Sequence, residues 1–486
     1  MTANWEIELK LETDLSGIDV LAHASILALV DVEEQKQTST YFDTPEQDIC
    51  KAGLSLRICK IGTKRIQTVK AESNAMAGLF ARAEWEMAIR QDKPVIDDHH
   101  TPLRTLVSAS QLAKLSAIFA IVVTRHRRSI MQDGAQIELA LDRGEIQAGG
   151  AITPISEFEL ELKAGSPAAL FVLARTLGEL APLHLSTLSK AQRGYDLLAR
   201  DNTPSVKFQA IALISAMTSS EGFQAIANAC VHHFRLNQSI MFRAENAEAL
   251  HQARVALRRL RSALSIFHHM LADDCFDHIQ SELRWIAGEL DMARDIDVLL
   301  ASIHDEGARK TLQVAHSQAY AGARGALISQ RLRILMLDLV EWIMIGKWLT
   351  APADGMLIER PIEAFAIDAL DRCRRGIKRR GRRLARLDDR ERHRLRIKVK
   401  KLRYSADFFE LLFPGKKASR HSKAFRRALE ALQGILGDLH DRTTGAALLA
   451  KFDIADANQH KPSLKAMLER AAENYKLLVD AKRFWR

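Results

Sequence analysis

The sequence has few cysteines, few aromatic residues and no uninterrupted hydrophobic run of transmembrane length. Its 486 residues include five cysteines, none of them in a CxxC pair. Scattered cysteines predict reduced thiols in a cytoplasmic protein and exclude a disulfide framework or a zinc ribbon. The longest apolar stretch, residues 334–349, is interrupted by Asp338, Glu341 and Lys347, which favours a buried helix. No basic and apolar leader opens the chain, so we expect a cytoplasmic protein without a membrane partner.

The positive charge is concentrated in the C-terminal part of the chain. The net charge is +10, but residues 1–202 contain 22 basic and 27 acidic residues, whereas residues 203–486 contain 48 and 33. Such an asymmetry predicts two domains with different roles. The basic part is expected to attract a polyanion, namely nucleic acid, an acidic membrane surface or a phosphate polymer. Nucleic acid is disfavoured, because the basic stretches are poor in aromatic side chains for base stacking.

The periodicity of hydrophobic residues also changes along the chain. It is close to two over residues 1–165 and close to 3.6 from residue 218 to the C-terminus. We therefore predict an α+β fold, with an antiparallel, strand-rich domain over 1–202, a linker over 203–217 and a helical domain over 218–486. The predicted strands are 5–12, 38–43, 54–59, 65–71, 82–90, 121–131, 136–142 and 156–163. The predicted N-terminal helices are 14–30, 101–117, 167–180 and 191–200.

The helical part contains an internal repeat. Residues 251–264 (HQARVALRRLRSAL) align without gaps on residues 393–406 (HRLRIKVKKLRYSA), and Asp295 aligns with Asp441 further on. Nearly equal spacing between the two sets of motifs indicates a duplicated unit. We predict two similar helical bundles, approximately residues 218–350 and 354–486.

Several predicted strands carry charged residues on one face and apolar residues on the other. In WEIELKLE (5–12), Glu6, Glu8 and Lys10 fall on the same side of the strand. The pattern fits either a solvated outer face with cross-strand ion pairs or a closed sheet whose charged faces line a tunnel. In a tunnel, the basic side chains would bind phosphate oxygens. Clustered carboxylates would hold a hard divalent cation such as Mg²⁺ or Mn²⁺.

The N-terminal motifs resemble the CYTH domain, whose fold is the triphosphate tunnel. EIELK (6–10) matches the ExExK signature that opens that domain. Seven further motifs follow in family order: YFDTP (41–45), GLSLRI (53–58), TVKA (68–71), RAEWE (82–86), IELALDRGEI (137–146), EFELELK (157–163) and LSKAQRGY (188–195). The resemblance implies an antiparallel β-barrel tunnel and metal-dependent hydrolysis of inorganic triphosphate to diphosphate and phosphate.

Carried over position by position, the resemblance implies a set of metal ligands and a set of phosphate-binding residues. The metal ligands are Glu6, Glu8, Glu159 and Glu161, with Glu84, Glu86 and Asp142 as further metal-binding or water-positioning carboxylates. The phosphate-binding residues are Lys10, Arg57, Lys70, Arg127 and Lys190, with Arg125 and Arg82 as additional substrate-binding residues. The implied cofactor is Mg²⁺ or Mn²⁺. In one departure, Cys59 stands where the family often has a second arginine, and Lys60 is expected to point to the opposite face.

The repeated helices carry a basic stripe in each copy. The first stripe is His251, Arg254, Arg258 and Arg261, and the second is His393, Arg396, Lys400 and Arg403. A solvated basic face is the simple interpretation, but the stripe is duplicated and has almost no acidic partner one turn away. Residues 218–486 resemble the CHAD domain, which implies that these eight residues line a polyphosphate-binding face. The histidines would then hydrogen-bond phosphate or pack between helices. Asp295 and Asp441 are expected to cap helices or to pair with the arginines.

Three functions remain open from the sequence. The first is hydrolysis of inorganic triphosphate in the tunnel, with polyphosphate bound by the helical domain. The second is another reaction in the same tunnel, either hydrolysis of thiamine triphosphate or cyclisation of a nucleotide. The third is binding of polyphosphate without turnover. The absence of an obvious aromatic box for a thiazolium or adenine ring favours the bare inorganic substrate.

Overall fold

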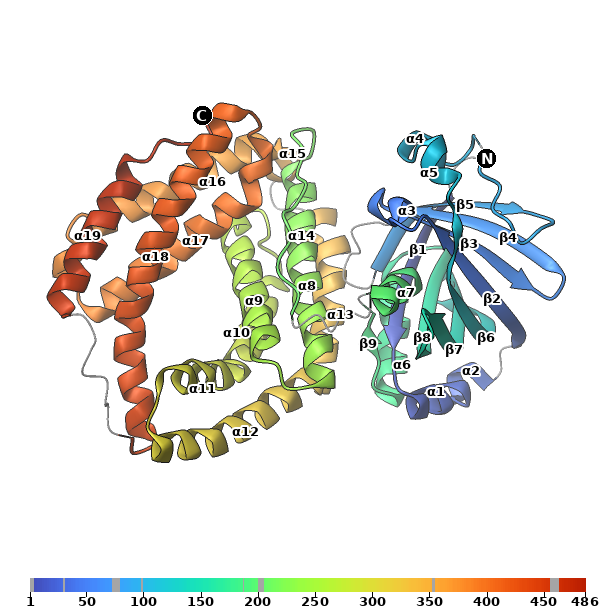
Figure 1. Ribbon diagram of the computed structural model, residues 1–486, viewed down its shortest axis with the longest axis horizontal. Helices are drawn as coiled ribbons and strands as arrows, with labels where there is room; N and C mark the ends of the chain where they lie inside the picture. The colour runs from blue at the N-terminus through green and yellow to red at the C-terminus, as the bar shows by residue number, and fades with distance from the viewer. Residues whose placement is uncertain are drawn as a thin grey trace. The chain divides into compact units, whose positions relative to one another are not determined.

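The structure is a computed structural model that describes residues 4–28, 31–71, 79–97, 99–186, 188–199, 205–351, 355–454 and 463–486. Contacts within the chain divide it into two compact units. The tunnel unit contains Met1–Pro204 and Ile328–Ile345, and the helical unit contains Ser205–Leu327 and Gly346–Arg486. The predicted α+β class is confirmed, because the sheet is confined to the first unit and the second is helical (Figure 1). The exact domain and linker boundaries remain predictions.

An antiparallel sheet forms the centre of the tunnel unit. Its strands are β1 (Asn4–Glu12), β2 (Glu33–Asp43), β3 (Leu54–Ile61), β4 (Lys64–Ala71), β5 (Leu79–Ala88), β6 (Ser116–Gln132), β7 (Ala135–Ala148), β8 (Ala151–Ala164) and β9 (His184–Leu185). The strand order is β5-β4-β3-β2-β6-β7-β8-β1-β9, and β1 also pairs with β5. Strand β1 pairs with β5 through residues 4–9 and with β8 through residues 8–12. Hydrogen bonding thus links β5, at one end of the sheet, to β1, next to the other end, and makes the sheet tunnel-like.

The helices of this unit differ in part from the prediction. Where one helix was predicted over 14–30, the described residues up to 28 form two, α1 (Leu15–Ala22) and α2 (Ser25–Ala28). The helix predicted over 101–117 is wrong in extent, because only α4 (Leu103–Leu106) and α5 (Ala109–Leu112) are helical and β6 begins at Ser116. Ser108 starts the second of these helices with a capping box to Gln111, but the β-branched and alternating sequence after residue 115 favours a strand. Short α3 (Asp48–Lys51) and the predicted α6 (Ala168–Leu180) and α7 (Lys190–Ala199) complete the set.

Helix α7 packs closely against the sheet and thereby positions its first residue, Lys190. Tyr195 of this helix belongs to a buried cluster with Tyr41 and Phe119. The rings of Tyr41 and Phe119 stack with centroids 4.6 Å apart. A Cβ atom at Gly194 would lie 2.2 Å from the ring of Phe119, so glycine is required for this close approach.

A helix from the C-terminal half of the sequence belongs to the tunnel unit. Helix α13 (Gln330–Ile345) is assigned to that unit by its contacts and packs on α6 and β9. Arg175 of α6 donates hydrogen bonds to Asp338, 2.6 Å away, and to Glu341. The apolar face of α13 is buried, as predicted for the stretch that includes Trp342. No helix in the described residues is both long enough and apolar enough to cross a membrane.

The helical unit contains the two copies of the internal repeat. Its helices are α8 (Ser219–Arg243), α9 (Ala247–Phe267), α10 (Phe276–Glu289), α11 (Asp291–Ser302), α12 (Glu306–Ile328), α14 (Lys347–Thr350), α15 (Gly355–Glu359), α16 (Ile362–Gly381), α17 (Asp389–Phe409), α18 (Lys416–Lys451) and α19 (Leu464–Asp480). The repeated motifs lie in α9 and α17, which begin at the side-chain caps Asn246 and Asp388. These two helices pack against each other, so the repeated stripes come from neighbouring elements.

Candidate functional site

The tunnel unit contains a cavity of about 290 Å³ that is lined mostly by charged side chains. Its lining residues are Glu8, Lys10, Tyr41, Ser55, Arg57, Lys70, Glu84, Glu86, Arg125, Arg127, Glu138, Ala140, Glu159, Glu161, Lys163, Ser189, Lys190 and Ala191. Eleven of the predicted tunnel residues are in this set. Asp142 lies in the wall beside them, paired with Arg125 and Lys190. The backbone pairs Glu6 with Arg82, but the side chains of these two residues lie outside the described structure.

The register of the sheet arranges the carboxylates in rows across neighbouring strands. In the outer row, Glu8 of β1 lies opposite Glu161 of β8, and Glu161 lies opposite Glu138 of β7. In the next row, Lys10 lies opposite Glu159, which lies opposite Ala140. In an antiparallel sheet, residues directly opposite each other project to the same face. All of these side chains therefore enter the same cavity.

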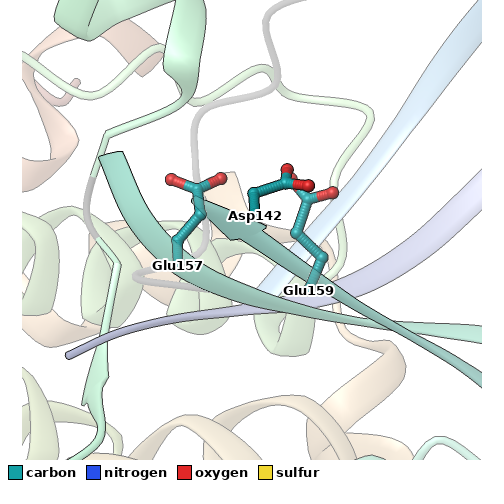
Figure 2. Close-up of side chains that lie close together, drawn as sticks. All are labelled: Asp142, Glu157 and Glu159. Atoms are coloured by element: carbon teal, nitrogen blue, oxygen red, sulfur yellow. The ribbon is translucent and has the colours of Figure 1, made fainter. Parts of the chain in front are cut away.

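Three carboxylates form a buried acidic cluster, the inner cluster, in which Asp142 lies opposite Glu157 and Glu159 is the glutamate of the second row. Asp142, Glu157 and Glu159 have carboxylate oxygens within 4.8 Å of one another. Figure 2 shows the three carboxylates on the same side of the sheet, with those of Asp142 and Glu159 directed toward each other. Asp142 and Glu157 are 0% exposed. Such carboxylates are stable as anions only when positive groups compensate for the loss of water.

Four basic side chains provide this compensation, one of which, Arg193, lies 3.5 Å from Glu157. The ammonium of Lys190 lies 2.8 Å from Asp142 and 2.9 Å from Glu159, and it also donates to Glu157. Arg125 lies 2.5 Å from both Asp142 and Glu159. Lys10 donates to Glu159 and lies 3.1 Å from Glu8. The acidic cluster and these bases thus form one buried ionic network.

The network sets the protonation states of its members. Burial alone would raise the pKa of Glu159, but Lys10, Lys190 and Arg125 hold that pKa well below its usual range. Lys190 and Arg125 likewise lower the pKa of Asp142 against the effect of burial. At Glu157 burial prevails over the attraction of Lys190, and the pKa is raised. The pKa of Lys190 is itself raised, because Asp142 and the two glutamates outweigh its burial.

The opposite side of the cavity presents bases with fewer partners. Arg57 of β3 has a buried Nε atom without a hydrogen-bond partner among the described residues. Lys70 of β4 lies 3.0 Å from Glu84, and Arg127 of β6 lies 3.7 Å from Glu138. Cys59 is buried two residues beyond Arg57 on the same strand. Lys60 is exposed and does not line the cavity, so no base takes the place of the family arginine at this position.

Sequence reasoning missed several residues that contribute to the site. They are Tyr41, Ser55, Glu138, Lys163 and Ser189 in the cavity and Glu157 in the acidic cluster. Glu138 and Glu157 lie in IELALDRGEI (137–146) and EFELELK (157–163), whose alternation puts them on the same strand faces as Asp142 and Glu159 respectively. The alternation therefore contained the signal for both. Tyr41 lies opposite Arg57 in the strand register, which the sequence does not reveal.

In the helical unit, the two basic stripes meet between α9 and α17. Arg254 lies 2.5 Å from Asp291 and 3.6 Å from Asp295, and Arg396 lies 3.8 Å from Asp441. Asp295 and Asp441 are in helix interiors, so they pair with arginines rather than cap helices.

The histidines of the stripes are partly buried. Burial and neighbouring arginines lower the pKa of His251 and of His393. The ring of His393 lies 4.7 Å from that of His440. Within the part of the chain that the structure describes, neither stripe histidine belongs to a cluster of potential metal ligands.

Comparisons with known proteins agree with this division of the chain. The CYTH domain profile matches residues 4–195 and the CHAD domain profile matches residues 225–450. An inorganic triphosphatase from Haemophilus influenzae is 31% identical over 194 residues, which are 39% of this chain and 54% of the relative. The chain thus spans about half the length of that curated relative.

Solved structures of similar domains are more distant. The CHAD domain of Ricinus communis has a TM-score of 0.45 and 28% identity, and the match covers 56% of this chain and 90% of that domain. PptA from Streptomyces chartreusis has a TM-score of 0.33 and 18% identity, with 54% of this chain and 96% of that chain covered.

The fold and the cavity define a protein with a charge-lined, tunnel-like β domain and an α-helical domain. Residues 4–195 match the CYTH domain and residues 225–450 match the CHAD domain, in that order along the chain. This confirms the resemblance drawn from the sequence motifs.

Proposed function

We propose that the tunnel unit hydrolyses inorganic triphosphate to diphosphate and phosphate with the help of Mg²⁺ or Mn²⁺. The observation that carries this proposal is the lining of the 290 Å³ cavity, which combines seven basic side chains with six acidic ones. The bases suit phosphate oxygens and the carboxylates suit a hard cation. The similarity to an inorganic triphosphatase supports the choice of substrate.

The balance of charge in the cavity argues for a divalent cation. The lining has an excess of only one positive charge, whereas a triphosphate carries several negative charges. The outer carboxylate row, Glu8, Glu138 and Glu161, offers oxygen donors from three adjacent strands. The inner cluster is less suited to the cation, because Lys190 already lies between its three carboxylates. A bound cation would neutralise phosphate charge and polarise the phosphoryl group.

The protein side chains divide the remaining work. Arg57, Lys70 and Arg127 bind and orient the phosphate chain from β3, β4 and β6. Lys10, Arg125 and Lys190 are already paired with the carboxylates of the inner cluster. Because these pairs hold the three basic side chains in place, they set how far the substrate enters the cavity. Glu84 and Glu86 of β5 line the cavity and are placed to orient a water molecule and accept its proton.

The test is phosphate release from inorganic triphosphate in the presence of Mg²⁺ or Mn²⁺. Glu8→Gln is expected to lower turnover by about 100-fold or more, because it removes an oxygen ligand of the cation. Glu12→Gln is the matched control, since Glu12 is on the same strand but does not line the cavity. If thiamine triphosphate or ATP is hydrolysed faster than inorganic triphosphate, that compound and not inorganic triphosphate is the substrate. No turnover of any of the three would leave phosphate binding as the function of the tunnel.

For the helical unit, the proposal is binding of inorganic polyphosphate along the two basic stripes. The support is geometric, since Arg258 and Arg403 keep buried Nε atoms without hydrogen-bond partners among the described residues. Arg261 is exposed at the end of its stripe. Such donors suit the oxygens of a phosphate chain. A titration of the full chain with long-chain polyphosphate tests the idea, and Arg258→Ala should weaken binding while Arg143→Ala in the tunnel unit should not.

A further inference from the structure

A groove of about 650 Å³ lies beside the C-terminal residues of the helical unit, which are marked C in Figure 1. Its lining comes from three segments that are far apart in the sequence. They are the first turns of α16, residues 412–421 around the start of α18, and residues 484–486. None of the eight stripe residues lines this groove, so it is separate from the surface proposed for polyphosphate. We call it the α18 groove.

One wall of the α18 groove is apolar and includes Phe413, Phe484 and Trp485. Trp485 is 1% exposed, its ring lies 5.1 Å from that of Phe425, and its Nε1 atom donates to Asp371, 3.0 Å away. The ring of Phe484 lies 5.9 Å from that of Phe413. These contacts form the wall without a ligand, so it is ready to cover an aromatic or apolar group.

The first turn of α18 adds unused hydrogen-bond donors to the groove. Gly415 precedes this helix with a φ of 110° and has no side chain that could accept a hydrogen bond from the helix start. The first backbone hydrogen bond of the helix runs from the amide of Ser419 to the carbonyl of Gly415, over 2.9 Å. The amides of Lys416, Lys417 and Ala418 have no hydrogen-bond partner among the described residues. Free amides at the positive end of a helix dipole favour an anion.

A buried histidine is a second, independent sign of a ligand at this place. His421, on the next turn of α18, is 9% exposed and lines the groove. Its ring has no hydrogen-bond partner among the described residues, yet its nitrogens are not sealed off from the outside. Burying an imidazole without a partner costs the hydrogen bonds that it makes with water. An oxygen of a ligand in the groove would restore one of these bonds.

The side chains at the edge of the groove carry more positive than negative charge. Lys416 and Lys417 are exposed and have no ion-pair partner among the described residues. Arg486 donates to Asp371 through one nitrogen, and its side chain is 57% exposed. Among the described lining residues Glu363 alone is acidic, and it lies in the first turn of α16, where the helix dipole favours a carboxylate. The groove therefore attracts an anion.

We propose that the α18 groove binds an organic phosphate, in which a phosphate group is carried on an aromatic or apolar body. The phosphate lies at the start of α18, where the three amides, His421 and the ammonium groups of Lys416 and Lys417 donate to its oxygens. These six donor groups exceed the roughly four acceptor positions of a carboxylate, which favours a phosphate. The apolar body lies against the wall that contains Trp485, which favours an organic phosphate over the inorganic ion.

The experiment is a calorimetric titration of the full chain with phenyl phosphate, at constant pH and ionic strength and with a chelator present. Inorganic phosphate and benzoate serve as matched probes, since the first lacks the apolar body and the second lacks the phosphate. We expect phenyl phosphate to bind about 10-fold more tightly than either probe, because a phenyl ring is buried and the donors are all used. Equal affinity for inorganic phosphate or for benzoate would overturn the proposed class of ligand.

Variants of the groove test which residues hold the phosphate. The double variant Lys416→Gln with Lys417→Gln should weaken phenyl phosphate binding by about 10-fold, because two charged donors are lost at exposed positions. Lys423→Gln is the matched control, since Lys423 is an exposed lysine on the same helix that does not line the groove. His421→Phe keeps a ring of similar size and should weaken binding by about 5-fold or more. Wild-type affinity in the double variant would overturn the proposal.

A second measurement localises the ligand without any variant, because the tunnel and the basic stripes also attract phosphate. The rates at which an acylating reagent modifies exposed lysines are followed by mass spectrometry, with and without phenyl phosphate. Acylation of Lys416 and Lys417 should slow by about 5-fold or more at saturation, whereas that of Lys423 should be unchanged. Unprotected Lys416 and Lys417 at saturation would place the ligand elsewhere and overturn the inference. Arg258→Ala, which should weaken polyphosphate binding, should leave this protection intact, so the two proposals can fail separately.

Discussion

Glu8 on β1 lies directly opposite Glu161 on β8, and both side chains line the cavity of the tunnel unit. Like charges in such a cross-strand pair are unfavourable unless a cation lies nearby. Two lysines partly neutralise this pair: the ammonium of Lys10 lies 3.1 Å from Glu8, and that of Lys163 lies 2.5 Å from Glu161. The pair continues into a row through Glu138 on β7. This row is the arrangement that we assign to the metal.

The first prediction concerns Glu138, which the sequence motifs did not identify. Glu138→Gln should raise the metal concentration needed for half-maximal phosphate release by about 10-fold or more, because a neutral amide replaces one of three charged carboxylate donors. Glu145→Gln is the control, since Glu145 is on the same strand but outside the cavity. An unchanged metal dependence in Glu138→Gln would assign the metal to other carboxylates.

The second prediction concerns the stability of the buried network. Lys190 is 8% exposed and compensates Asp142, Glu157 and Glu159. Lys190→Met should lower the free energy of unfolding by about 3–5 kcal/mol at pH 7, because it removes the ammonium that contacts all three buried carboxylates. Denaturant melts of the full chain measure the change.

A dependence on pH distinguishes this cause from a simple packing defect. The carboxylates that remain in Lys190→Met become neutral as the pH falls. The difference in free energy of unfolding between wild type and the variant should therefore become smaller between pH 7 and pH 5. A difference in free energy of unfolding that does not change with pH would indicate a loss of packing instead.

The third prediction follows from the lowered pKa of Glu159. A carboxylate whose pKa is lower in the folded state contributes stability above its ordinary pKa of about 4, and this contribution is lost as the pH falls. Wild-type stability should therefore decrease below about pH 4.5, at up to about 1.4 kcal/mol per pH unit for this group. In denaturant melts from pH 5 to pH 2.5, the free energy of unfolding of Glu159→Gln should decrease less steeply with falling pH than that of wild type. If the free energy of unfolding of Glu159→Gln decreases as steeply as that of wild type, the lowered pKa of Glu159 is contradicted.

The sequence predicted much of this site because alternation in a strand determines which side chains share a face. Alternation placed Glu8 and Lys10 on one face of their strand, the resemblance to the CYTH domain implied that this face and that of Glu159 line a tunnel, and the structure puts all three side chains in the cavity wall. Alternation does not determine which residues on different strands lie opposite each other. The pairing of Glu138 with Glu161 depends on the register across β7 and β8, so the sequence could place Glu138 on the same face as Asp142 but could not reveal its partner.

The sequence also did not predict that helix α13 belongs to the tunnel unit. Its apolar pattern predicted a buried helix over residues 334–349; α13 covers that stretch up to Ile345, whereas Lys347–Thr350 form the separate helix α14. An amphipathic pattern shows that a face is covered but does not identify what covers it. The chain between the two repeats thus contributes to the tunnel unit, although neighbouring residues in the sequence belong to the helical unit.

The fourth prediction tests whether α13 is a structural part of the tunnel unit. Arg175 of α6 binds both Asp338 and Glu341 of α13, and all three side chains are half-buried. Arg175→Ala should lower the free energy of unfolding by about 1 kcal/mol, since partly exposed pairs contribute little and this one is shared by two carboxylates. Arg143→Ala is the control, because the Arg143–Asp19 pair at 3.2 Å is largely exposed and should contribute less.

Hydrogen exchange localises the effect of Arg175→Ala. If α13 is held to the tunnel unit by these contacts, peptides from residues 330–345 and from α6 should exchange faster in the variant than in wild type. Peptides from α9 and α17 should be unchanged, because those helices belong to the other unit. Equal acceleration throughout the chain would mean that the variant destabilises the whole molecule. Unchanged exchange in α13 would show that its apolar face, and not Arg175, holds it in place.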